Sequence, residues 1–247
     1  MNNLVTEVKQ NVVFVAEFLA VIVIIFMIAY FMEKWEKKRT GNKERILTTQ
    51  KISMVGMLSA ISAILIIFGE IPLPMIAPDF YKLDVSELPA VLGGFALGPV
   101  AGIMIELCKI LLKVIFKPTT TAFVGELANF AIGCSFVLPA SILYQARKSK
   151  KMAIFSCVVG TIAMTVFGTV FNAFYLLPKF AQMYGMPLNT IIGMGTAINS
   201  SIHDVLTFVV MIVAPLNLVK GVLVSVVAVL IYKPLSPILK EIGIHRR

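Results

Sequence analysis

The residues of this chain that could do chemistry are a few polar side chains inside long apolar segments. Asn217 and Lys220 stand three residues apart in the middle of the last apolar run, beside Pro215 and Gly221. Residues at this spacing share one face of a helix. A lysine without a partner in such surroundings loses several kcal/mol or gives up its proton. The pair therefore predicts hydrogen-bond donors that face a cavity.

Two other apolar runs carry asparagines. Asn129 follows Glu126 by three residues near the start of its run, and Asn172 lies towards the end of another. Glu126 also suits a helix N-terminus, where the helix dipole favours negative charge. Polar groups at membrane depth face a cavity or a partner by default. Together with Asn217, these positions predict a pocket with apolar walls and a few fixed polar groups.

The run from 99 to 117 holds Glu106, Lys109 and Lys113 on one helix face. Two interpretations stay open. The group is either an internal ion pair, with Lys113 reaching towards the membrane surface, or a site that faces a ligand. Aromatic residues could stack on a flat ligand, although each is also typical of ordinary packing; they are Tyr81, Phe95, Phe123, Phe171 and Tyr175.

The elements that position these residues must be membrane helices. The chain is 58% hydrophobic and 14% charged, with a mean hydropathy of +0.91, which is unlike a soluble domain. Within a bilayer every backbone N–H and C=O must be paired inside the protein, so long apolar runs form helices. This predicts an all-α integral membrane protein with about seven helices, the third of them short, at 12–32, 52–70, 87–98, 99–117, 124–144, 153–176 and 204–232.

The basic residues cluster between these runs, which argues against a nucleic-acid-binding face despite the net charge of +9. Fourteen Lys and Arg lie in the connections 33–45 and 145–152 and in the tail from 233, against four on the other side. Because cytoplasmic loops are enriched in Lys and Arg, we expect the N-terminus outside and the C-terminus in the cytoplasm.

Two connections on the expected outer side are long. The segment 69–89 contains four prolines, which predict a semi-rigid loop that could serve as a lid. The segment 178–203 is polar and includes Gly185, Pro187 and Gly195, so we expect a second long external connection. It leads to Ser201-x-x-Asp204, which resembles a capping box for the last helix, with His203 beside it.

The run 52–70 carries two overlapping small-residue steps, Gly56 with Ala60 and Ser59 with Ala63. Small residues four apart let membrane helices approach closely. Either an internal contact or a partner subunit would satisfy this pattern, and the sequence does not choose between them.

Enzyme and ATPase motifs are absent from the sequence: there is no G-x-x-x-x-G-K-[ST], H-E-x-x-H or nucleophile elbow. ATP-driven transport would therefore need a partner ATPase, and we expect no metal or cofactor. A membrane enzyme acting on lipids is the alternative from a different class. Its candidate acid–base groups are Glu106, Asp84 and His203.

Five motifs in order carry a family resemblance: 82–90 (KLDVSELPA), 94–99 (GFALGP), Glu106 with Lys109, 125–130 (GELANF) and 215–221 (PLNLVKG). Together they resemble the riboflavin-specific substrate-binding (S) components of energy-coupling factor (ECF) transporters. The similarity covers about residues 50–240. An S component for another vitamin or precursor is the alternative within transport.

The resemblance implies a six-helix S-component bundle over 49–247, with an outward-facing vitamin site closed by the loop 69–89. Residues 1–48 would then be an extra N-terminal transmembrane helix and a basic cytoplasmic linker. Asn217 and Lys220 match the family's ligand-binding asparagine and lysine. With riboflavin as the ligand, and flavin mononucleotide as an open alternative, the other expected substrate-binding residues are Asn172, Asn129, Glu126, Lys109, Asp84 and Tyr81.

The resemblance also implies partners and a location. An S component has no catalytic chemistry of its own, lies in the bacterial cell membrane, and works with a transmembrane coupling (T) subunit and two cytoplasmic ATPase subunits. The family's small-residue docking motif matches the present chain loosely, at Gly56, Ser59, Ala60 and Ala63.

Overall fold

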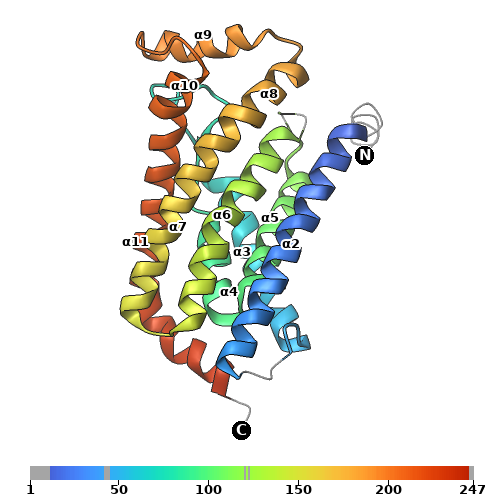
Figure 1. Ribbon diagram of the computed structural model, residues 1–247, viewed down its shortest axis with the longest axis vertical. Coiled ribbons are helices and arrows are strands. Elements are labelled where there is room, and N and C mark those ends of the chain that lie inside the picture. Colours follow the sequence, from blue (N-terminus) through green and yellow to red (C-terminus); the bar gives the residue numbers. More distant parts are fainter. Residues whose placement is uncertain (1–11, 42–44, 120, 122, 245–247) are drawn as a thin grey trace.

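The computed structural model describes residues 12–41, 45–119, 121 and 123–244, with side chains between 13 and 231. Most helices lie side by side along the long axis of the molecule (Figure 1). The strands β1 (Ile71–Pro72) and β2 (Lys82–Leu83) are two residues each and pair antiparallel in the first long loop. The expected all-α membrane class is confirmed.

The described chain contains the helices expected from the apolar runs. They are α2 (Val12–Thr40), α3 (Thr49–Gly69), α4 (Glu87–Leu97), α5 (Pro99–Phe116), α6 (Val124–Ala146), α7 (Lys150–Phe171) and α11 (Ala214–Ile244). Five described stretches are long and apolar enough to cross a bilayer: Val13–Thr40, Thr49–Gly69, Val124–Ala146, Lys150–Tyr184 and Val205–Ile231. The helix α5 has the length to do so but carries Glu106, Lys109 and Lys113.

Two π-helical turns interrupt the long helices at positions that face each other. The turn η1 (Asn172–Leu176) joins α7 to α8 (Leu177–Tyr184). The turn η2 (Val209–Val213) joins α10 (Val205–Phe208) to α11, and it contacts η1. Turns of this kind inside α-helices are frequent at functional sites.

The long connection expected over 178–203 is largely helical, since it contains most of α8 and then α9 (Leu188–Ile198). Figure 1 shows α9 lying across the end of the bundle. Gly185 ends α8 in the left-handed conformation that glycine adopts easily. In α9, Ile191 and Ile192 are buried, so the packing of an apolar face decides the conformation over the local glycines.

The capping box at the start of the last helix is also one turn later than expected. Asp204 accepts a hydrogen bond from Thr207 N at 2.7 Å, and Thr207 Oγ1 accepts from Asp204 N at 3.0 Å. Ser201 instead lies in the preceding turn, where its N–H donates to Asn199 Oδ1. The hydrogen bonds from Thr207 lower the pKa of the Asp204 carboxyl.

The N-terminal helix α2 is attached to the bundle near both of its ends. Near its start, the Glu17 carboxylate accepts from Tyr175 Oη at 2.5 Å and lies 2.9 Å from Lys179 Nζ. Near its other end, the buried Glu33 accepts from Val100 N at 3.0 Å. Glu33 thereby places negative charge at the N-terminus of α5, where the helix dipole favours it.

Glycine is required where α2 meets the α4–α5 turn. Gly98 has a φ of +116° and joins α4 directly to Pro99, the first residue of α5. A Cβ atom on Gly98 would stand 2.8 Å from Glu33 Oε1. The Gly98-Pro99 pair therefore makes a tight turn and leaves room for the carboxylate of α2.

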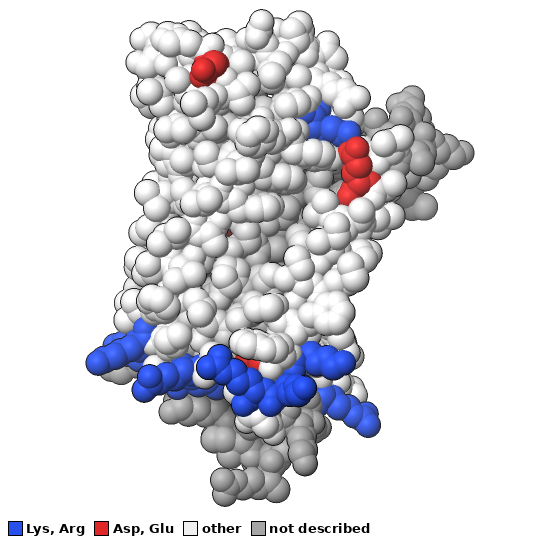
Figure 2. Space-filling view, viewed as in Figure 1, with Lys and Arg blue, Asp and Glu red and all other residues white. Residues whose placement is uncertain are grey.

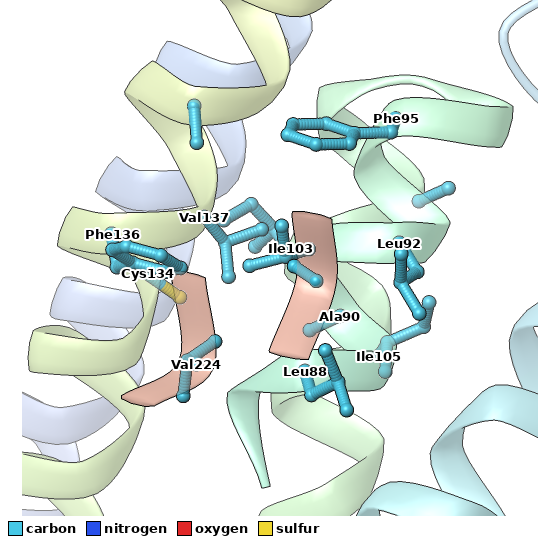
Figure 3. Packing of buried hydrophobic residues seen from close by; sticks show 14 of the residues in the cluster. Leu88, Ala90, Leu92, Phe95, Ile103, Ile105, Cys134, Phe136, Val137 and Val224 are labelled. Atoms are coloured by element: carbon cyan, nitrogen blue, oxygen red, sulfur yellow. The ribbon is translucent and has the colours of Figure 1, made fainter. Parts of the chain in front are cut away.

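The main hydrophobic core lies at the level of the short helix α4, between α5, α6 and α11. Figure 3 shows that the side chains from these helices point towards one another. The labelled members are Leu88, Ala90, Leu92, Phe95, Ile103, Ile105, Cys134, Phe136, Val137 and Val224. This packing fixes α4, whose first residue, Glu87, takes part in the ion pairs described below.

The charged surface divides the molecule into two different ends. Figure 2 shows Lys and Arg gathered in a band at the end where α2 finishes and α7 begins; we call this the basic end. The end that carries the β1–β2 loop, α8 and α9 is the loop end. A single band of this kind is typical of the cytoplasmic boundary of a membrane protein.

Candidate functional site

A cavity of about 100 Å³ lies in the half of the bundle nearer the loop end. Four segments surround it: the loop that contains β2, the first turns of α6, the region around η1 and α8, and the region around η2 and α11. Its lining residues are Phe80, Tyr81, Lys82, Leu83, Gly125, Ala128, Asn129, Ile132, Gly133, Met164, Asn172, Phe180, Val213, Leu216, Asn217 and Lys220. Five of the eight residues expected to bind substrate therefore line this one cavity.

Asn217 presents a polar atom that the protein leaves without a partner. Its Nδ2 atom is buried and has no hydrogen-bond acceptor among the described residues. A Cβ atom on Gly168 of α7 would collide with this nitrogen, so a glycine is needed here for the amide to fit against α7. A buried donor without an acceptor is costly, and a bound ligand oxygen would satisfy it.

Asn129 offers the complementary group. Its Oδ1 atom is buried and accepts no hydrogen bond from any described residue. In the described part of the cavity wall, Asn217 on α11 thus offers an unpaired donor and Asn129 on α6 an unpaired acceptor. A ligand with both a carbonyl and an N–H or O–H group could pair with both amides.

The other expected polar residues of the wall have partners within the protein. Tyr81 Oη donates to Asn172 Oδ1 at 2.6 Å, which links the loop to η1 across the cavity. Asn172 Nδ2 donates in turn to Gly168 O at 2.7 Å. The loop is thus held in place by a hydrogen bond to a residue that lines the cavity.

Lys220 lines the cavity, as the sequence predicted, and its ammonium group also has partners within the protein. Its Nζ atom lies 2.8 Å from Asp84 Oδ2 and 2.8 Å from Glu87 Oε1. Asp84 belongs to the loop and Glu87 begins α4. The lysine therefore ties the loop and α4 to α11, in addition to forming part of the wall.

The ion pairs continue away from the cavity. Lys109 Nζ lies 3.3 Å from Glu87 Oε1 and 2.6 Å from Glu106 Oε2, and all three residues are buried. We call Asp84, Glu87, Glu106, Lys109 and Lys220 the buried ion network. Its geometry decides the question that the sequence left open for α5: Glu106 and Lys109 form an internal ion pair, and neither lines the cavity.

Glu126 also lies outside the lining. Its Oε2 atom accepts hydrogen bonds from the hydroxyls of Thr119 at 2.9 Å and Thr121 at 3.2 Å, and Lys113 Nζ lies 3.7 Å from Oε1. These contacts fix the turn that precedes α6. Glu126, Asp84 and Lys109 thus lie outside the cavity lining, and their contacts hold the elements that form it.

A cluster of charges anchors the loop from the other side. Glu70, at the end of α3, lies 3.1 Å from Lys82, 3.1 Å from Lys113 and 2.8 Å from Lys117. Burial alone would raise the pKa of the Glu70 carboxyl, but the three lysines hold that pKa below its ordinary value. Because Lys82 also lines the cavity, this cluster connects the cavity wall to α5.

Sequence reasoning missed the apolar part of the wall. Phe80, Phe180, Met164 and Leu216 have no polar signal that separates them from core residues. A usable signal existed on α6, where small residues at 125, 128 and 133 flank Asn129 and leave space beside it. The aromatic residues Phe95, Phe123, Phe171 and Tyr175 do not line the cavity. Phe95 stacks on Tyr144 in the core at 4.3 Å between ring centroids.

Comparison with known proteins places this fold in a family. The family model for the ECF transporter, substrate-specific component, matches residues 50–232. A solved structure described as "Structure and mechanism of the S component of a bacterial ECF transporter" has 34% sequence identity and a TM-score of 0.59. It covers 77% of the present chain, and 98% of its own chain is covered.

Two curated relatives are similar over most of the chain. The riboflavin transporter RibU of Staphylococcus aureus (strain TCH60) is 35% identical over 193 residues, which is 78% of this chain and 94% of the relative. The riboflavin transporter FmnP of Bacillus subtilis (strain 168) is 31% identical over 196 residues, 79% of this chain and 96% of the relative. Together with the match to the family model and the shared fold, these similarities show that the chain belongs to the family of ECF transporter substrate-specific components.

Proposed function

We propose that this protein is the riboflavin-binding subunit of an ECF transporter in the cell membrane. The observation that carries the proposal is the cavity with two unpaired amide atoms, Asn129 Oδ1 and Asn217 Nδ2, in a chain whose relatives include the riboflavin transporters RibU and FmnP. Those relatives are transport proteins and not enzymes, and the chain shares their family.

The chemistry of riboflavin suits this wall. The vitamin has a flat, uncharged tricyclic ring whose edge carries carbonyl and N–H groups, so it needs amide donors and acceptors and no counterion. The apolar residues Phe80, Phe180 and Leu216 offer surface to the ring. Burial of the ring would supply most of the binding energy, and the two amides would supply selectivity.

Entry of such a ligand requires the wall to move. Pockets for ligands of drug size measure about 300–1,000 Å³, whereas this cavity measures about 100 Å³. The loop residues Phe80 and Lys82 separate it from a second hollow of about 570 Å³ beside α8 and α9. We infer that the loop 69–89 is the lid, and that it opens when the hydrogen bond from Tyr81 to Asn172 breaks.

The partners would be a transmembrane coupling subunit and two cytoplasmic ATPases, which supply the energy that this chain has no motif to obtain. A docking surface for the coupling subunit is available on α3. Gly56 and Ala60 are exposed there, whereas Ser59 and Ala63 are buried against the bundle. We therefore assign docking to Gly56 and Ala60 and internal packing to the other two.

The orientation follows from the charge distribution. The basic end would face the cytoplasm, with the loop end and the cavity outside, the N-terminus outside and the C-terminus inside. Residues 1–48 would be an addition to the six-helix unit 49–247, since the family model begins at residue 50. Riboflavin binding by a chain that begins at residue 49 would support this division, and loss of binding would make α2 part of the unit.

Fluorescence quenching tests the proposal directly. When riboflavin is titrated into the purified full-length protein, its fluorescence should be quenched, with a dissociation constant between nanomolar and micromolar. Flavin mononucleotide and thiamine serve as comparison ligands. Folded protein that quenches no flavin would refute the function. Tighter binding of thiamine would instead favour the alternative of an S component for another vitamin.

The enzyme alternative receives no support from the geometry. Glu106 and Asp84 are paired with lysines in the buried ion network, and His203 is exposed next to the start of α10. None of the three lines the cavity. The groups that would have to share a proton with a substrate therefore do not meet at one site.

A further inference from the structure

A groove on the outer surface of the bundle is separate from the cavity. It runs between α7 and α11, has a volume of about 500 Å³, and shares no lining residue with the cavity. It is lined by Ile154, Cys157, Val158, Thr161, Ile162, Leu218, Val222, Ser225, Val226, Val229 and Leu230. The two hydroxyls among these residues, on Thr161 and Ser225, lie 3.0 Å apart and satisfy each other. The groove is therefore apolar to a ligand.

The length and width of the groove identify the shape of its occupant. From Leu218 to Leu230 the wall on α11 is about 18 Å long at 1.5 Å per residue, which is close to the thickness of about 15 Å of one leaflet. A volume of about 500 Å³ over this length leaves a mean cross-section of about 28 Å². A long, narrow hollow of this kind suits an extended hydrocarbon chain.

The charge at one end of the groove identifies the head group. Lys150 and Lys151 precede Ile154 by four and three residues, so they lie on the groove face of α7. Both are exposed, and the segment 145–153 contains no acidic residue. They are the first two residues of α7, which begins at the basic end. Basic pockets between membrane helices bind anionic lipid head groups.

We propose that the groove is a binding site for an anionic phospholipid of the leaflet at the basic end. One acyl chain lies between α7 and α11, and the head-group phosphate is held by Lys150 and Lys151. The apolar wall binds any phospholipid chain, whereas the two lysines select for negative charge. The site is independent of the transported ligand, because no residue of the cavity takes part in it.

Native mass spectrometry of the full-length protein in detergent tests the site. The probes are phosphatidylglycerol and phosphatidylcholine with identical acyl chains. The wild-type protein should bind phosphatidylglycerol about tenfold more tightly. The double variant Lys150→Gln, Lys151→Gln should lose this preference, while the control Lys34→Gln, Lys38→Gln, which removes two exposed lysines of α2 at the same end, should keep it.

A second variant tests the groove itself. Val226→Phe fills it and should weaken the binding of both lipids, whereas Val23→Phe, at an exposed apolar site of α2, should weaken neither. An unchanged melting temperature in lipid-free detergent shows that each variant folds. Equal affinity for the two lipids in the wild type would overturn the proposal, as would a preference that survives loss of Lys150 and Lys151. Dimers of this chain that disappear in Val226→Phe would assign the groove to a second copy.

Discussion

At the scale of single residues, the two asparagines and the lysine of the cavity differ in what the protein already gives them. Asn129 and Asn217 each keep one buried amide atom without a partner among the described residues. Lys220 has two carboxylate partners at 2.8 Å. Substitutions of the asparagines should therefore act on binding, whereas substitution of the lysine should act on both binding and stability.

The first prediction concerns Asn217. The Asn217→Ala variant should bind riboflavin at least about tenfold more weakly, since a ligand acceptor buried without its donor loses about 1–3 kcal/mol. Its melting temperature should change little, because Nδ2 bonds to no described group in the protein. Fluorescence titration and thermal unfolding measure the two effects. Val219→Ala, at a membrane-facing position of the same helix, is the matched control. If Asn217→Ala binds riboflavin with wild-type affinity, the ligand does not bind against α11.

The second prediction concerns Lys220. Removal of one partner from a buried ion pair costs about 3–5 kcal/mol, because the remaining charge has no compensation. Lys220→Ala should therefore lower the free energy of unfolding by about this amount and weaken riboflavin binding by at least about tenfold. Adding Asp84→Asn should restore part of the stability, since it removes one of the uncompensated carboxylates. Stability losses that simply add in the double variant would show that Asp84 and Lys220 do not interact.

At the scale of elements, α2 and α3 have opposite relations to the bundle. The helix α2 is fastened by Glu17 and Glu33 near its two ends. The helix α3 buries Ser59 and Ala63 and leaves Gly56, Ala60 and several large apolar side chains exposed. The first arrangement predicts a fixed part of the molecule, and the second predicts a surface that a partner covers.

The third prediction tests the attachment of α2. Glu33→Gln removes the negative charge at the N-terminus of α5 and should lower the free energy of unfolding by about 1–2 kcal/mol. Riboflavin affinity should stay within about twofold, because Glu33 lies at the basic end and outside the cavity lining. Thermal unfolding is the measurement, and Lys38→Gln on the exposed face of α2 is the control. An unchanged melting temperature would show that Glu33 is dispensable for the attachment.

The fourth prediction tests the docking surface. Ala60→Trp adds bulk on the exposed face of α3 and should abolish riboflavin uptake by cells while leaving riboflavin binding to the purified protein unchanged. Val23→Trp places the same bulk on an exposed site of α2 and should leave uptake intact. Uptake assays and fluorescence titration separate the two readouts. If uptake persists in Ala60→Trp, the coupling subunit docks on another face.

At the scale of the whole molecule, the asymmetry between the two ends gives the fifth prediction. Lys38 lies at the basic end and Ser201 at the loop end, and both are exposed. Each is replaced by cysteine in a separate variant. In intact cells a membrane-impermeant maleimide should label Ser201→Cys, whereas Lys38→Cys should react only after the cells are opened. The native cysteines Cys134 and Cys157 are buried and Cys108 is half-buried, so the wild-type protein serves as the background. The reverse labelling pattern would invert the topology.

The sequence by itself determined the membrane class, the apolar segments and the asparagines worth testing, because hydropathy and the cost of buried polar groups act along the chain. Only the tertiary structure decided which polar groups share a cavity. Lys220 bonds to Asp84, which lies 136 positions away in the sequence, and Tyr81 bonds to Asn172, which lies 91 positions away. A local pattern contains no information about a partner so distant, so Lys109 and Glu126 could not be separated from the cavity wall in advance. The helices α8 and α9 escaped prediction for the same reason, since burial against the bundle overrides their glycines.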